Sequence, residues 1–123
     1  MSSSVPQLAL LFQEMTPDEK RVLRVLQAHR GRANAITGAD LASRVELPWR
    51  ACREVMKSLI EIHHCRIGSA PGRPPGYFMI ETAEEAQEVY RVLRGQGLST
   101  LKRAAVIRGI GLRELVGQLS LEV

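Results

Sequence analysis

Apolar residues recur at helical spacing along residues 1–63 and predict four helices. A short amphipathic helix is expected within residues 1–16, where apolar side chains are three and four positions apart. Its stripe consists of Leu8, Leu11, Phe12 and Met15. The next helix, from Pro17 to about His29, begins with a threonine cap, a proline at the first helical position and a glutamate three residues after the cap. Each of these helices must bury its apolar face against another element.

Two further helices are expected to meet across a tight turn. Thr37 caps a short helix within residues 36–45. Only a three-residue turn then precedes Pro48, which suits the first position of another helix that extends to about His63. This spacing predicts a helix–turn–helix.

The pattern changes after the predicted helix that ends near His63. Residues 65–69 and 77–80 are typical of two short strands around a loop rich in proline and glycine, so they predict a β-hairpin with a long tip. A capping box at Thr82 then opens a further helix. We expect that helix to end at Gly95 or Gly97.

From Leu98 onward, apolar residues are separated alternately by three and four positions, which is the heptad pattern of paired helices. Arg108 interrupts it. The pattern favours a homodimer or higher oligomer, whereas Gly109 and Gly111 favour packing within one chain, because each costs about 1 kcal/mol inside a helix. The candidate oligomerisation residues are Leu98, Leu101, Ala105, Leu112, Leu115 and Leu119.

Together these elements predict a mainly α fold with a small β-hairpin wing. A hairpin that follows a helix–turn–helix is a wing, so the expected fold is a winged helix-turn-helix with additional N- and C-terminal helices. The expected organisation is an N-terminal tail and short helix at 1–16, a winged helix-turn-helix domain at 17–81, and C-terminal helices at 82–123.

Composition and charge narrow the function. A chain of 123 residues with 45% apolar and 24% charged residues can fold around one core but is too short for most large enzymes. Of its 17 basic and 13 acidic residues, eight basic and four acidic ones lie within residues 30–73. That difference equals the whole net charge of +4, and the flanking segments are neutral. The positive charge therefore coincides with the predicted helix–turn–helix and hairpin, which suggests an anionic partner.

The helix that follows Pro48 has a cationic face. Arg50, Arg53 and Lys57 lie within about 60° of one another, opposite the apolar side of that helix. Two glutamates share this face, so a solvated surface with ion pairs between neighbouring turns is the alternative interpretation. Trp49 lies at the edge of the apolar side and is interpreted first as a packing residue.

The stretch GADLASRVELPWRACREVMKSLIE, followed by CRIGS and PPGYFMIET, resembles the winged helix-turn-helix of the biotin-operon-repressor-like group. It is also similar to small phage and prophage DNA-binding proteins. The resemblance covers Thr37–Thr82 and departs from the group at Glu46, in a turn where the group commonly has glycine or another small residue. The positions that carry it are Leu41, Ala42, Val55, Leu59, Gly76, Tyr77 and Phe78. The ligase domain of the full-length repressor does not fit after Thr82, so the resemblance implies no ligase activity.

The resemblance implies that the helix after Pro48 lies in the major groove of duplex DNA. Arg50 and Arg53 would then read base edges, because arginine binds guanine with two hydrogen bonds. Lys57 would contact a phosphate or a further base, and the hairpin would place an arginine on the backbone or in the minor groove. The candidate DNA-binding residues are Arg44, Trp49, Arg50, Arg53, Lys57, Arg66 and Arg73.

Two functions of different classes are therefore expected. The first is sequence-specific binding of double-stranded DNA, as a transcription regulator or a phage replication or packaging factor. The second is an adaptor that keeps the winged-helix fold and binds a larger nucleic-acid machine, such as RNA polymerase or a replisome.

Other chemistry is not expected. The sequence lacks the G-x-S-x-G and phosphate-binding-loop motifs, so we predict neither enzymatic activity nor a cofactor. His63, His64 and Cys65 are adjacent and diverge on a helix, so no metal site is predicted. Two cysteines and the absence of a signal-like N-terminus indicate a cytoplasmic protein. The apolar run at residues 8–12 is too short to cross a membrane.

Overall fold

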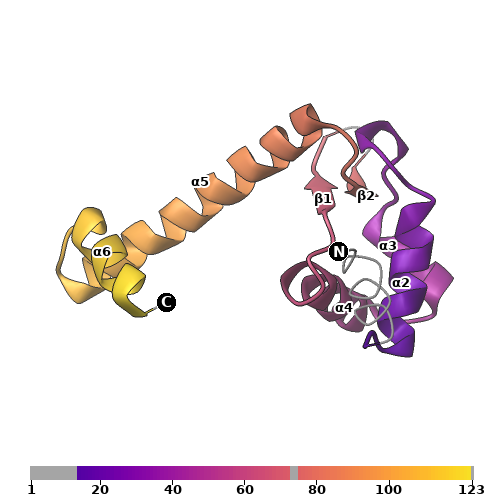
Figure 1. Ribbon diagram of the computed structural model, residues 1–123, viewed down its shortest axis with the longest axis horizontal. Coiled ribbons are helices and arrows are strands. Elements are labelled where there is room, and N and C mark those ends of the chain that lie inside the picture. The colour runs from indigo at the N-terminus through magenta and orange to yellow at the C-terminus, as the bar shows by residue number, and fades with distance from the viewer. Residues whose placement is uncertain (1–13, 73–74, 123) are drawn as a thin grey trace, which may run out of the picture. The chain divides into compact units, whose positions relative to one another are not determined.

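A computed structural model describes residues 14–72 and 75–122 of the chain (Figure 1). The described part is mainly helical with a small antiparallel β-hairpin, as predicted. The chain divides into two compact units, Met1–Ala86 and Gln87–Val123. The predicted stripe of the first helix lies outside the described residues except for Met15, which is buried.

The elements of the described residues follow one another in a simple order. They are α2 (Pro17–Gln27), the 3-10 turn η1 (Arg32–Asn34), α3 (Gly38–Val45), α4 (Trp49–Glu61), β1 (Ile67–Ala70), β2 (Gly76–Met79), α5 (Ala83–Arg108) and α6 (Leu112–Glu122). Helix α2 ends two residues before the predicted end at His29. Helix α4 begins one residue after Pro48, which serves as its N-cap, and ends two residues before the predicted end at His63. Differences of this size are usual at fraying helix ends.

The predicted helix caps are confirmed. The Thr16 hydroxyl accepts the Glu19 N–H at 3.1 Å while the Glu19 carboxylate accepts the Thr16 N–H at 2.8 Å, so α2 begins with a full capping box. The Thr37 hydroxyl accepts the Asp40 N–H at 3.1 Å at the start of α3. A second capping box opens α5. Local sequence signals therefore set the start of three helices.

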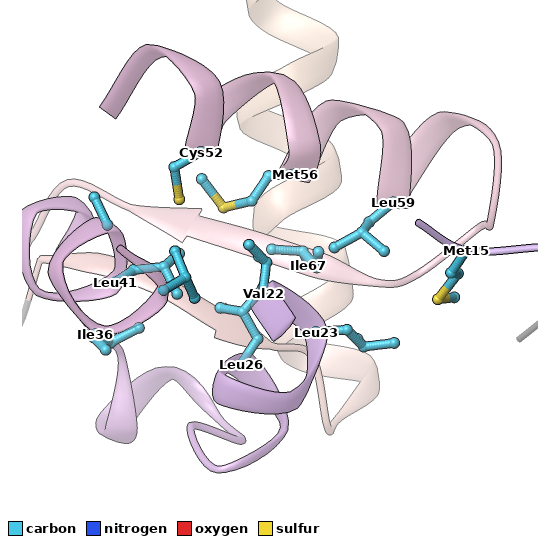
Figure 2. Packing of buried hydrophobic residues seen from close by; sticks show 12 residues of the cluster. Met15, Val22, Leu23, Leu26, Ile36, Leu41, Cys52, Met56, Leu59 and Ile67 are labelled. Carbon is cyan, nitrogen blue, oxygen red and sulfur yellow. The ribbon is translucent and has the colours of Figure 1, made fainter. Parts of the chain in front are cut away.

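The core of the first unit forms where α4 packs on α2, α3 and the hairpin. Figure 2 shows Cys52, Met56 and Leu59 on the inner side of α4, directed toward Val22 and Leu26 of α2. All five side chains are buried. Full burial of one such side chain contributes about 1.5–3 kcal/mol, so this contact fixes which side of α4 faces inward.

Strand β2 is paired along both edges. On one edge it pairs antiparallel with β1, with Gly68 opposite Phe78. On the other edge Tyr77 exchanges two hydrogen bonds with Ile36, at 2.7 and 2.8 Å. Gly76 has a φ of 127°, and a Cβ there would overlap the Ile36 carbonyl oxygen, so glycine is required. The hairpin is thereby fixed to the segment that leads into α3.

The turn between α3 and α4 places Glu46 in the left-handed conformation, with φ 56° and ψ 44°. The Glu46 N–H bonds to the Ser43 carbonyl at 3.2 Å, and the Leu47 N–H bonds to the Ala42 carbonyl at 3.1 Å. This pair of bonds is the Schellman ending of a helix, in which glycine usually occupies the left-handed position. The turn therefore forms around glutamate at an energetic cost.

The predicted end of α5 at Gly95 or Gly97 is wrong. The helix continues through both glycines to Arg108 (Figure 1). A glycine inside a helix costs only about 1 kcal/mol, which neighbouring helix-forming residues can offset. The break falls instead at Gly109, where φ is 77° and the bonds from Gly109 to Val106 and from Ile110 to Ala105 form a Schellman ending.

The candidate oligomerisation residues lie on both sides of this break. Ala105 and Leu115 are buried. The other four, Leu98, Leu101, Leu112 and Leu119, are half-buried. Burial of Ala105 and Leu115 shows that the single chain already covers part of the heptad pattern with its own residues.

A buried carboxylate joins α2 to the end of α4. The Ser58 hydroxyl donates to one oxygen of Glu19 at 2.5 Å, and His63 Nε2 lies 3.2 Å from the other. Burial opposes ionisation of Glu19, but the hydrogen bonds from Ser58 and the Thr16 N–H, together with His63, outweigh it and lower the pKa of Glu19. The ionised carboxylate is thus the form that the fold stabilises.

We predict that Glu19→Gln makes the free energy of unfolding less dependent on pH. Because the pKa of Glu19 is lower in the folded chain, its stabilising contribution is present above its ordinary pKa of 4.5 and is lost as pH falls through the folded value. Glu19→Gln should also cost about 1–3 kcal/mol near pH 7, since Ser58 and His63 lose a charged acceptor. Urea denaturation at a series of pH values measures both effects. The control Glu61→Gln, at an exposed position of the same unit, should change neither. An unchanged pH dependence in Glu19→Gln would contradict the account.

We predict that Glu46→Gly stabilises the protein by about 0.5–1 kcal/mol, because glycine adopts the left-handed conformation without the steric cost. The matched control is Glu54→Gly inside α4, which should destabilise by a similar amount. Thermal unfolding followed by circular dichroism compares the two. Destabilisation by both substitutions would show that the turn gains nothing from glycine.

Candidate nucleic-acid interface

The outer side of α4 carries the densest group of candidate residues. Arg50, Arg53 and Lys57 are exposed, as the helical spacing predicts. Within the described part of the chain, none of the three forms a hydrogen bond or an ion pair. Their charged groups are therefore available to a partner.

The acidic residues of α4 do not neutralise this surface by direct pairing. Glu54 and Glu61 are exposed on the same side of the helix. Across residues 14–72 and 75–122, none of the ion pairs includes either glutamate. The alternative interpretation requires ion pairs between neighbouring turns of α4, and the described residues of α4 form none.

Trp49 connects the beginning of α4 to two other elements. Its ring lies against Tyr77 of β2, with centroids 5.7 Å apart and an angle of 52° between the planes. It also covers Gly38 at the start of α3, where a Cβ would lie 2.5 Å from the indole. The side chain is 38% exposed. Trp49 therefore packs on Tyr77 and Gly38 while part of its side chain stays exposed.

The remaining candidates lie on neighbouring elements of the same unit. Arg44 is exposed in the last turn of α3. Arg66 is exposed just before β1, where its carbonyl accepts the Ile80 N–H at 2.9 Å. Arg73, in the predicted tip of the hairpin, lies outside the described residues. The candidate basic residues that the structure describes therefore lie on α3, on α4 and at the base of the hairpin.

Sequence reasoning missed the contacts that orient α4. Tyr77 and Gly38 were not predicted as partners of Trp49, and Glu19 was predicted only as part of a helix cap. No periodic pattern marks these residues, because they become neighbours only when the elements pack. The close approach of the Trp49 indole to Gly38 has no signal in the sequence.

Cys52 is buried in the fold, and His63 and Cys65 are half-buried. His63 Nδ1 is buried and has no hydrogen-bond partner. Burial raises the pKa of the Cys52 and Cys65 thiols, and the Glu19 carboxylate adds to the rise at Cys65. In the described segments no three His, Cys, Asp or Glu side chains are arranged to hold a metal ion.

No protein-family model matches the chain, and no curated protein or solved structure matches it significantly. Of the helices that the structure describes, none has the length and apolar character to cross a membrane.

We predict that Gly38→Ala shifts the fluorescence emission of Trp49 to longer wavelength. The added methyl group displaces the indole, which then becomes more exposed to water. Trp49 is the sole tryptophan, so the signal reports only this contact. Gly95→Ala is the control, because nothing lies within 4 Å of that position and the emission should not change. Equal emission spectra for both variants would contradict the packing of Trp49 on Gly38.

Proposed function

We propose that the chain binds duplex DNA as a winged helix-turn-helix protein, with α4 as the helix that enters the major groove. The order of three helices followed by a hairpin supports this fold. The pairing of Ile36 with Tyr77 supports it further, because this bridge joins the segment between α2 and α3 to the second edge of β2.

The observation that carries the proposal is the set of unpaired cations on the outer side of α4. Arg50 and Arg53 lie in the first two turns, the part of a recognition helix that contacts base edges. Arginine suits this role because its guanidinium can bind both acceptors of guanine. Buried residues on the other side of α4 prevent these side chains from turning inward.

The neighbouring cations suit contacts with the DNA backbone. Lys57 lies one turn beyond Arg53, and its ammonium group would bind a phosphate. Arg66 lies at the base of the hairpin and would bind a second phosphate. Trp49, held by Tyr77, would fix the start of α4 against the groove. In this proposal the protein acts as a transcription regulator or as a replication or packaging factor of a phage.

The test begins with selection of bound duplexes from a random pool by the full chain. We expect a recovered sequence motif and an affinity that falls steeply with salt, with a slope of roughly 0.9 per phosphate contact on logarithmic axes. Arg53→Ala should cost about 1–3 kcal/mol and relax the preference at one base position. Arg66→Ala should weaken binding to all sequences alike and lower the salt slope by about 1.

The matched control is Arg24→Ala, which removes an exposed arginine from α2 and the same charge from the chain. It should leave the base preference unchanged. An empty selection, or equal binding by wild type and the Arg50→Ala/Arg53→Ala variant, would overturn the proposal. Capture of a polymerase or replisome subunit by wild type but not by that variant would then favour the adaptor.

A further inference from the structure

Helix α5 carries a second heptad pattern that differs from the one predicted near the C-terminus. Its positions are separated by four and three residues in alternation and include no charged side chain. They are Ala86, Tyr90, Leu93, Gly97, Thr100, Ala104 and Ile107. We call this set the α5 seam. Because the pattern spans three heptads on one continuous helix, it has the minimum length of a coiled-coil signal.

The large side chains of the α5 seam are open to water. Tyr90 is 58% exposed, Leu93 59% and Ile107 88%. The half-buried residue Leu98 lies on a different side of the helix, about 100° from Gly97, whereas Leu101 borders the α5 seam. An aligned set of exposed apolar residues usually marks a surface that another molecule covers.

We propose that a second copy of this chain covers the α5 seam, so that two α5 helices pair antiparallel. The interaction is isologous, since the same residues contribute from both copies and a twofold axis relates them. The proposal concerns assembly and does not depend on DNA binding.

The sizes of the side chains in the α5 seam favour the antiparallel orientation. When Leu93 faces Gly97 of the second copy, the same register places Tyr90 against Thr100 and Ala86 against Ala104. Leu93 and Tyr90 then each meet a small residue. Nothing lies within 4 Å of the position that a Gly97 side chain would occupy, so there is room for a leucine there. In a parallel pair Gly97 would face Gly97 and leave a gap, which destabilises a helix interface.

The charges along α5 favour the same orientation. The first turns carry the exposed acids Glu84 and Glu88, Arg91 and Arg94 follow, and the last turns carry Lys102, Arg103 and Arg108. Glu85 is bound by the backbone N–H groups of Arg32 and Glu81 and does not contribute. An antiparallel pair brings the acidic end of each helix beside the basic end of the other, whereas a parallel pair aligns like charges. The helix dipoles also oppose one another in the antiparallel pair, which is the favourable arrangement.

Sedimentation equilibrium of the full chain without DNA, over a wide range of concentration, tests the proposal. We expect a reversible monomer–dimer equilibrium that Leu93→Glu shifts to monomer. Val106→Glu is the matched control: Val106 is 76% exposed on the same helix but lies outside the α5 seam, so dimerisation should persist. Circular dichroism verifies that both variants keep their helices. A monomer at every concentration, or a dimer that Leu93→Glu leaves intact, overturns the proposal.

Gly97→Leu tests the orientation. In the antiparallel pair the new leucine meets Leu93 of the second copy, so the dimer should weaken by about tenfold or more, a typical consequence of overpacking. Combining it with Leu93→Gly exchanges the two sizes and should restore the dimer. A dimer strengthened by Gly97→Leu would indicate parallel helices and overturn the proposal. A dimer that forms only after removal of residues 1–13 would overturn it in favour of coverage by the chain's own N-terminal segment.

Discussion

The candidate interface depends on the burial of one side of α4. Cys52, Met56 and Leu59 pack on α2 and leave no freedom for α4 to rotate about its axis. Since the helix has a fixed angle of about 100° between residues, burial of this side determines that Arg50 and Arg53 face outward. Other contacts refine this arrangement: Trp49 ties the beginning of α4 to Tyr77, and Glu19 ties its end to α2. The hydrophobic contact thus provides the orientation, and the polar contacts secure both ends of the helix.

Helices α4 and α5 each have one buried and one exposed side, but their exposed sides differ in character. In the first unit the apolar side of α4 is covered by the core, and its charged side is free to bind an anion. In the second unit Ala105 and Leu115 are buried, but Tyr90, Leu93 and Ile107 are left exposed on another side of α5. The first unit is therefore suited to contact with a charged ligand and the second to contact with an apolar surface. The two proposals therefore assign recognition and assembly to separate parts of one chain.

Local signals made much of this structure predictable from the sequence. The caps at Thr16 and Thr37 set helix starts, and the alternation of apolar and basic residues along α4 placed its cationic side correctly. Contacts between distant residues were not predictable, because pairing of Ile36 with Tyr77 or burial of Glu19 arises only from tertiary packing. The helix ends were predicted less well than the starts. Glycine signals the end of a helix only where the chain adopts a left-handed turn, as at Gly109, and not where the helix continues, as at Gly95.

The central claim is that the outer side of α4 is the surface that binds duplex DNA. Titration of the labelled protein with a selected duplex, followed by NMR of backbone amides and arginine side chains, tests it most directly. The account predicts that the largest shifts occur along Trp49–Glu61 and at the two strands of the hairpin, and that α6 is unaffected. Shifts confined to the second unit, or none at a duplex concentration that saturates binding, would contradict the account.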